Sequence, residues 1–285
     1  MVRTKLSSRL TSRILVFWLL TDAAALCAYV LFSLPAIKAA QTQLARNALW
    51  EVIHNVCVPG QSQYGNPAPC LRVDLAGGGK NGFAILQDPR KSNQFLVIPT
   101  ERIAGIESPA LREPGAPNYF ASAWQSRTFI NDAIHRELPR DDVGMAVNSV
   151  EGRTQDQLHI HLTCARVDVV TALHKNEASI GTRWSPFPVS FFGHRYTAMW
   201  VPGENLDQNN PFILLAEMPD AASDMSNRTL AIVGLTRADG TKGFVLLSDH
   251  VNKKIADEAG GEELLDHTCA LASSGSPRTD SRAKD

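Results

Sequence analysis

The chain contains 285 residues, of which 44% are hydrophobic, and it carries a formal net charge of -1 with a sequence pI near 6.7. That length and that hydrophobic content are enough to bury a substantial core. The near-neutral charge gives no sign of a nucleic-acid partner, because nucleic-acid-binding proteins present an excess of basic side chains.

A basic segment followed by a long apolar run opens the chain. Residues 1–13 contain four Lys or Arg side chains, and residues 14–34 contain Asp22 as their only formal charge. Such a run is long enough to cross a bilayer as a helix, and the preceding positive charge predicts a cytoplasmic amino terminus with the rest of the chain across the membrane. A cleaved signal peptide is the alternative, because the small residues between Ala36 and Ala40 resemble a cleavage site.

Four cysteines follow the apolar run, namely Cys57, Cys70, Cys164 and Cys269. Four cysteines permit three pairings. Cys57 and Cys70 bracket a loop rich in Pro, Gly, Gln and Asn, which favours a local bridge and leaves Cys164 to pair with Cys269. Disulfides form in oxidising compartments, so this interpretation agrees with an exported domain. Four free buried thiols are the alternative.

The hydrophobic periodicity of the first half predicts a mixture of helices and strands. In chain order we expect a helix over residues 41–56, a strand over 83–87 after a Gly-rich turn at 77–82, a buried central strand over 94–99, a Pro-rich loop over 108–117, and the longest helix over 118–138 with Asn118 as its cap.

The second half predicts more strands than helices. We expect strands over residues 143–149 and 157–164 joined by a hairpin, a helix over 166–180, an extended loop over 183–188, a strand over 196–201, a helix over 212–218, a hairpin of 230–235 with 244–248, a short helix over 262–271 that carries Cys269, and a disordered tail over 273–285. We expect the helices to pack across the sheet, which makes the fold class α+β.

The most informative stretch is the predicted strand Gln157-Leu-His-Ile-His-Leu162. Apolar residues alternate with His159 and His161, so the two imidazoles share one face of a half-buried strand. Same-face side chains on a strand are roughly 7 Å apart, twice the rise per residue, so one phosphate or one metal ion could contact both rings.

Three interpretations of the pair compete. In the first, one histidine attacks phosphorus while the other holds the phosphoryl oxygens. In the second, both histidines bind zinc together with a third ligand, for which His194 is available. In the third, both histidines lie on the polar face of an edge strand and have no function. The hairpin of residues 151–155 favours a functional site, because it is expected to bring Asn148, Arg153 and Gln155 near the imidazole face.

The segment Phe95–Pro99, followed later by Asn148, Gly152, Thr154 and the strand with His159 and His161, resembles the histidine-triad superfamily of nucleotide hydrolases and transferases. Gln157 stands where those proteins have the first histidine of the triad. A glutamine amide can donate to a phosphate oxygen or to a backbone carbonyl, but it cannot carry a proton through a catalytic cycle.

A closer resemblance, to the bacterial membrane-anchored CDP-diacylglycerol pyrophosphatases, covers most of the chain after the apolar run. The resemblance implies a histidine-triad-like (HIT-like) α+β domain over residues 41–272 with a carboxy-terminal covering lobe, facing the periplasm from the inner membrane. The similar segments are Arg102–Pro109, Pro117–Phe120, Ala123–Gln125 with Arg127, Gly152–Gln155, Arg183–Trp184, Pro211–Phe212 and Asp266–Cys269.

The same resemblance implies hydrolysis of CDP-diacylglycerol to CMP and phosphatidate. A neutral imidazole is a nucleophile near pH 7 without a metal, so we expect no cofactor. By position, His159 is the expected nucleophile and His161 the expected support of the phosphoryl group. Two alternatives stay open, a metal-dependent phosphohydrolase and a non-catalytic module that binds nucleotide or lipid. A homodimer is a further expectation from the superfamily, and the residues expected to bind substrate are Asn148, Arg153, Thr154, Gln155 and Gln157.

Overall fold

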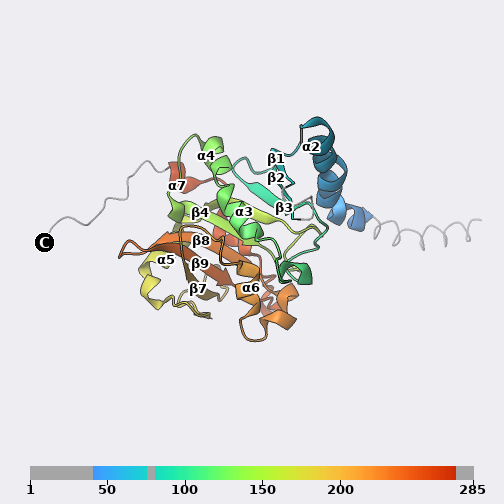
Figure 1. The fold of residues 1–285 in the computed structure, drawn as a ribbon. Helices are drawn as coiled ribbons and strands as arrows, with labels where there is room; N and C mark the ends of the chain where they lie inside the picture. The colour runs from blue at the N-terminus through green and yellow to red at the C-terminus, as the bar shows by residue number, and fades with distance from the viewer. Residues whose placement is uncertain (1–40, 76–80, 274–285) are drawn as a thin grey trace, which may run out of the picture. The chain divides into compact units, whose positions relative to one another are not determined.

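The computed structural model describes residues 41–75 and 81–273 (Figure 1). The predicted cytoplasmic segment (1–13), the predicted membrane anchor (14–34) and nearly all of the predicted disordered tail lie outside these residues. Within the described part of the chain, no helix combines the length and the apolar character needed to span a membrane.

The fold is built on one antiparallel sheet, which has ten strands. Its order is β1-β2-β3-β5-β4-β8-β9-β7-β6, and β10 pairs separately with β5. The predicted α+β architecture is confirmed. The strands are β1 (Arg72–Asp74), β2 (Phe83–Gln87), β3 (Phe95–Pro99), β4 (Val143–Val147), β5 (Ile160–Ala165), β6 (Ser185–Pro186), β7 (Thr197–Pro202), β8 (Leu230–Thr236), β9 (Lys242–Ser248) and β10 (Leu265–Asp266).

Helices are short, apart from the first. Residues 41–52 are helical and continue through a π-helical segment into α2, as Figure 1 shows. The π segment is η1 (Ile53–Cys57), the helices are α2 (Val58–Tyr64), α3 (Tyr119–Gln125), α4 (Thr128–Ile134), α5 (Val167–Lys175), α6 (Pro211–Ala216) and α7 (Ala270–Ser273), and two 3₁₀ turns used below are η3 (Arg140–Asp142) and η8 (Gly261–Leu264).

Two predicted helices are wrong in detail. The pattern over residues 118–138 forms α3 and α4, and Ser126 between them turns its hydroxyl back to donate to Ser122 O at 2.7 Å. The expected helix over 262–271 is instead η8, β10 and the start of α7, because Leu265 and Asp266 pair with the end of β5. Tertiary pairing outweighs helix propensity there.

Two more boundaries differ from the prediction. The first helix runs on to Tyr64, through the expected loop between the first two cysteines, and ends where Gly65 takes a φ of 64°. Pro59 lies at the change from the π segment to α2, where the regular i→i−4 hydrogen bonding of the helix is already interrupted. The histidine strand begins at Ile160 rather than at residue 157, because Leu158 N donates to Ile103 O, outside the ladder of the sheet.

The two faces of the sheet are covered differently. One face buries a single apolar cluster under α3, α4 and α6. The other face has two apolar clusters, one under α5 and one under the first helix, with members such as Ile53 and Ile98. His161 lies between these two clusters, because the register sets it opposite Leu96 of one and Ala146 of the other. The site therefore lies inside the molecule, flanked by apolar packing.

Both disulfides predicted as the favoured pairing are present. Cys57 is bonded to Cys70, with their Cα atoms 5.7 Å apart, and Cys164 to Cys269, with Cα atoms 5.2 Å apart. The second bridge fastens the chain just before α7 to the end of β5.

Candidate active site

The two histidines lie in the middle of the sheet rather than on an edge strand. β5 runs between β3 and β4, and the register places His161 opposite Leu96 and Ala146. His159 precedes the strand by one residue, and its ring centroid is 4.8 Å from that of His161 at an interplanar angle of 72°. Only 8% of His159 and 6% of His161 is exposed, so the expected half-buried face is in fact covered.

His159 has a fixed tautomer. Its Nδ1 lies 2.7 Å from Gln157 O, and a carbonyl oxygen can only accept, so Nδ1 carries the proton and Nε2 keeps its lone pair. Burial lowers the pKa of His159, which is partly opposed by the Gln157 hydrogen bond and the charge of Glu262. The ring is therefore neutral at pH 7, the form that acts as a nucleophile or as a metal ligand.

His161 has the opposite tautomer. Gln94 Nε2 lies 2.8 Å from His161 Nδ1 and also donates to Glu262 Oε1 at 3.1 Å. The carboxylate can only accept, so this atom of Gln94 is the amide nitrogen, and His161 Nδ1 accepts from it. The proton of His161 therefore lies on Nε2. Burial, with the neighbouring His159, lowers the pKa of His161 to about 3.

The Nε2–H of His161 is a donor without a matched acceptor. Glu262 Oε2 lies 3.4 Å away, but the approach lacks hydrogen-bond geometry, and Nε2 is buried without a hydrogen-bond partner among the described residues. Burial opposes ionisation of Glu262, yet His161 and the contacting Lys91 hold its pKa down to about 2. A buried donor of this kind usually marks a missing ligand or water.

Small residues bring Glu262 to the sheet. Gly261 lies over the side chains of Ala146 and Ala231, and a Cβ on it would be 2.3 Å from Thr229 Oγ1 and 3.4 Å from Ala146 Cβ. Gly261 N also donates to Thr229 Oγ1 at 2.8 Å. Only a glycine permits this approach, which places the next residue against His161.

Gln157, the residue at the first triad position, is tied to the backbone. Its Nε2 donates to Pro99 O at 3.0 Å and to Glu101 O at 2.9 Å, and its side chain is buried. From the sequence, this amide could donate to a phosphate oxygen or to a backbone carbonyl, and in the structure it donates to backbone carbonyls. Gln157 therefore holds the start of β5 against the end of β3, while its own carbonyl oxygen orients His159.

The hairpin residues divide between the site and its surroundings. Asn148 Oδ1 accepts from Glu262 N at 3.1 Å, so Asn148 supports the segment that reaches His161. Arg153 pairs with Glu107 at 2.6 Å and with Asp156 at 3.2 Å. Its positive charge contributes to the lowered pKa of His159, although burial is the main cause.

The remaining two predicted substrate-binding residues are placed differently. Gln155 Oε1 accepts from Leu49 N at 2.9 Å, which ties the hairpin to the first helix. Thr154 is exposed. The geometry connects neither of them to the imidazoles through a hydrogen bond within the described residues.

Three residues of the site escape prediction from the sequence, namely Lys91, Gln94 and Glu262. They come from a turn, from the residue before β3 and from η8, and none belongs to a recognisable motif. One local signal exists, since the pair Gly260-Gly261 directly before Glu262 indicates a close approach of backbone to another element.

The zinc interpretation of the histidine pair requires a third ligand near His159 and His161, for which His194 is the candidate. Within the described residues, the one group of three metal-ligating side chains that meet is His194, Asp249 and Asp257, with ligand atoms within 4.8 Å of one another. His159 and His161 are not part of it. The third ligand proposed for a zinc ion on the histidine strand is thus engaged elsewhere.

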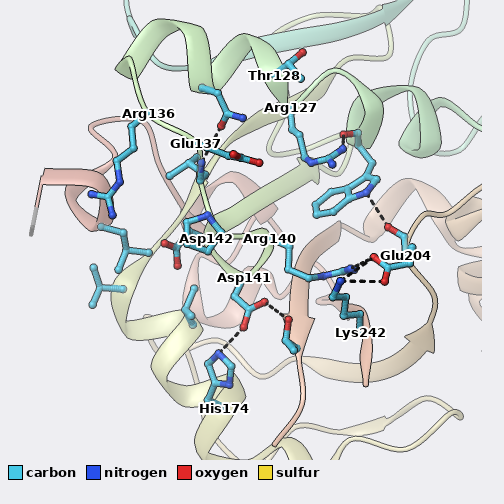
Figure 2. A pocket seen from close by; sticks show the side chains of 18 of the residues that line it. Arg127, Thr128, Arg136, Glu137, Arg140, Asp141, Asp142, His174, Glu204 and Lys242 are labelled. Atoms are coloured by element: carbon cyan, nitrogen blue, oxygen red, sulfur yellow. Dashed lines mark hydrogen bonds and ion pairs between the residues drawn. The ribbon is translucent and has the colours of Figure 1, made fainter. Parts of the chain in front are cut away.

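A cavity of about 1360 Å³ lies away from the histidine pair (Figure 2). It lies between α3, α4, η3, α5 and the β8–β9 hairpin, and none of the histidine-site residues lines it. Its Arg140 donates to Gly243 O at 2.8 Å, and its Arg127 guanidinium stacks over Trp124 at 4.6 Å. These two arginines are thus engaged in holding the fold.

Taken together, the site places a neutral nucleophilic nitrogen beside a buried N–H donor. The lone pair of His159 Nε2 can attack an electrophilic phosphorus, and the donor of His161 can stabilise an anionic oxygen. Fold and site thus define an α+β protein with a histidine pair suited to nucleophilic chemistry on an anionic group.

Comparisons with known proteins agree with that class. Residues 44–273 match the model of the family described as CDP-diacylglycerol pyrophosphatase. A protein of Yersinia pestis named CDP-diacylglycerol pyrophosphatase is 41% identical over 226 residues, which is 79% of this chain and 84% of that relative. The chain therefore belongs to the CDP-diacylglycerol pyrophosphatase family, and it is a hydrolase.

Proposed function

We propose that this chain hydrolyses the diphosphate of CDP-diacylglycerol to CMP and phosphatidate, with Nε2 of His159 attacking the cytidylyl phosphorus. The family supports the substrate. The observation that carries the mechanism is the hydrogen bond from His159 Nδ1 to Gln157 O, because it holds the lone pair on Nε2 of a buried neutral ring.

The reaction runs in two displacements. In the first, a bond forms between Nε2 and the cytidylyl phosphorus, and the bond from that phosphorus to the bridging oxygen breaks, so phosphatidate leaves with the electron pair. In the second, water attacks the same phosphorus and the nitrogen recovers its lone pair. CMP keeps the hydroxyl of the water, and the other proton passes to solvent. One difficult step is thereby divided into two easier ones.

His161 has the complementary role of donor. Its unsatisfied Nε2–H donates to a non-bridging phosphoryl oxygen, which carries more negative charge in the transition state. Lys91, held at the site through Glu262, adds positive charge nearby. Gln157 acts on position only, which explains how a histidine-triad-like site operates with glutamine at the first triad position.

The test is turnover and intermediate trapping with His159→Asn. Asparagine places an amide N–H where Nδ1–H was, so the bond to Gln157 O is kept while Nε2 is lost. We expect full-length wild-type protein to release CMP and, after acid-free quenching, to carry the added mass of one cytidylyl group. The variant should fold, bind CDP-diacylglycerol and show neither signal.

Two outcomes would favour the alternatives. CMP release that EDTA abolishes in folded protein, without any covalent adduct, would point to a metal-dependent phosphohydrolase that uses His159 and His161. Saturable binding of CDP-diacylglycerol by wild type with no CMP release would point to a binding module. Circular dichroism in each EDTA sample separates loss of metal chemistry from loss of fold.

We further propose that residues 14–34 anchor the domain to the bacterial inner membrane, with the domain in the periplasm. The apolar run supports the anchor, and two disulfides support an oxidising compartment. Carbonate extraction of membranes, with a variant lacking residues 1–40 as control, tests the anchor. Light scattering of detergent-solubilised protein tests the homodimer that we also propose from the superfamily.

A further inference from the structure

A second cluster of ionisable side chains lies on the other side of η8 from His161. Glu262 and Glu263 are neighbours, but Glu262 approaches His161 whereas Glu263 Oε1 lies 2.8 Å from His194 Nδ1. The hydroxyl of Tyr196 donates to the same oxygen of Glu263 at 2.7 Å. The histidine site and this cluster are therefore connected through one short turn.

Two buried aspartates complete the cluster. Asp249, which follows β9, is 6% exposed, and Asp257 is 3% exposed. The ligand atoms of these two residues and of His194 all lie within 4.8 Å of one another. The backbone fixes Asp257, because Asn252 and Asp257 form an isolated bridge and Ala259 N donates to Asp257 Oδ1 at 2.8 Å.

One carboxylate oxygen in the cluster has no partner. Asp249 Oδ1 accepts from His250 N at 2.7 Å, but Oδ2 is buried and meets no donor among the described residues unless the neighbouring carboxyl of Asp257 is protonated. Leaving a buried acceptor without a hydrogen bond destabilises the folded chain, and more so when the group is charged. This oxygen therefore indicates a ligand that the protein itself does not supply.

Within residues 41–75 and 81–273, acidic side chains outnumber basic ones in the cluster. Its carboxyl groups are Asp249, Asp257 and Glu263, and the only cation that the described residues place against Asp249 or Asp257 is a protonated His194. Buried carboxylates without cationic partners are unstable unless they take up a proton or a metal ion.

We propose that His194, Asp249 and Asp257 bind one divalent transition-metal ion of the Zn²⁺ or Mn²⁺ class. One imidazole nitrogen with two carboxylate oxygens suits these ions, whereas Mg²⁺ and Ca²⁺ take oxygen ligands. Bonds of about 2.1 Å place opposite ligands about 4 Å apart, so small side-chain rotations close the present group around an ion. Glu263 Oε1, which accepts from Tyr196, lies 2.8 Å from the same imidazole Nδ1 that faces Asp257, so Glu263 borders the ion.

The ion has a structural role in this proposal. It joins the turn before β7, the end of β9 and the segment that leads into η8, and η8 delivers Glu262 to His161. The proposed hydrolysis needs no metal, so this inference goes beyond the proposed function. Metal binding and fold stability test it without any reference to CMP release.

The experiment is calorimetric titration of full-length, EDTA-treated and desalted protein with ZnCl₂ and MnCl₂, with MgCl₂ and CaCl₂ for comparison. We expect one equivalent of Zn²⁺ or Mn²⁺ to bind. At a hundredfold excess over Kd, the apparent melting temperature should rise by about 5–10 °C. Asp249→Asn and Asp257→Asn, which keep side-chain size, should each weaken binding at least tenfold.

Two controls locate the ion. Asp141→Asn disturbs another histidine–carboxylate pair, with His174 at 3.0 Å beside the cavity of Figure 2, and should leave the binding unchanged. His159→Asn should also keep the full equivalent. Absence of saturable Zn²⁺ and Mn²⁺ binding to wild type overturns the proposal, whatever the variants do. Binding that survives both aspartate substitutions, or that is lost in His159→Asn alone, overturns it as well.

Discussion

Glu262 Oε2 lies 3.4 Å from His161 Nε2, and this approach connects the carboxy-terminal part of the chain to the histidine strand. The carboxylate also contacts Lys91 and accepts from Gln94 at 3.1 Å. Gln94 in turn donates to His161 Nδ1, so one connected network of side chains contacts both nitrogens of that ring. Such a network orients the ring while leaving its Nε2–H available.

Glu262→Gln should therefore lower kcat about tenfold without raising KM. Glutamine has nearly the same shape, but it cannot form the ion pair with Lys91 or keep its charge beside His161, so the donor becomes less well oriented. The measurement is CMP release at varied CDP-diacylglycerol concentration. Glu258→Gln, at an exposed position close in sequence, should match wild type. A raised KM with unchanged kcat would assign Glu262 to substrate binding instead.

The stability of the protein should fall between pH 6.5 and about pH 3, partly because of His161. In the folded chain, burial keeps the pKa of His161 at about 3, and the charged or titratable side chains around this ring are His159, Glu262 and Lys91. In the unfolded chain a histidine has a pKa of about 6.5. Above pH 6.5 neither state is protonated. Below it only the unfolded state gains the proton, which costs about 2 kcal/mol of stability by pH 5.

Urea unfolding at pH 7.5 and pH 5.0 measures this effect, with His161→Gln as the matched variant. Glutamine keeps a polar side chain of similar length but cannot take up the proton. The loss of unfolding free energy between the two pH values should be about 2 kcal/mol larger for wild type than for the variant. Equal losses in both proteins would show that His161 is not the titrating group.

Local patterns predicted the sheet well, because strand periodicity and turns are properties of neighbouring residues. β2 has the predicted bounds, and β3 is the buried central strand that its apolar run indicates. The period-two pattern also placed His159 and His161 on one face. The apolar stripe over residues 118–138 predicted one long helix where the structure has two. Both α3 and α4 pack on the same face of the sheet, so their apolar residues form one stripe despite the break at Ser126.

The environment of the histidines could not be predicted in the same way. A polar residue every second position indicates an exposed face, but at His161 this face is covered by η8, which is distant in sequence. Gln94 and Glu262 acquire their roles only through that packing. Gln157 likewise donates to backbone carbonyls only because residues 99–101 pass close to its side chain.

Gly261→Ala should destabilise the fold by about 1–3 kcal/mol and reduce activity, since the new Cβ would lie 2.3 Å from Thr229 Oγ1. Relief of that overlap moves η8 away from the sheet, and Glu262 with it. Thermal unfolding and CMP release check both effects. Gly181→Ala is the matched control, because a Cβ there meets nothing within 4 Å. Equal behaviour of the two variants would contradict the close packing of Gly261.

The Cys164–Cys269 bridge should contribute more stability than the Cys57–Cys70 bridge. Their sequence separations are 105 and 13, and a longer closed loop restricts the unfolded chain more, to about 4.7 kcal/mol near 100 residues against about 3 kcal/mol near 15. The long bridge also fastens the chain that follows η8 and β10. We therefore expect its loss to reduce CMP release as well, by loosening the segment that carries Glu262.

Paired substitutions compare the two bridges directly, because Cys164→Ala with Cys269→Ala and Cys57→Ala with Cys70→Ala each remove two buried sulfur atoms. Urea unfolding should show a loss of about 2–5 kcal/mol for the first pair and a smaller loss for the second. CMP release in folded protein should fall only for the first pair. A larger loss of stability in the second pair would mean that the first helix, rather than the carboxy-terminal segment, limits the stability of the domain.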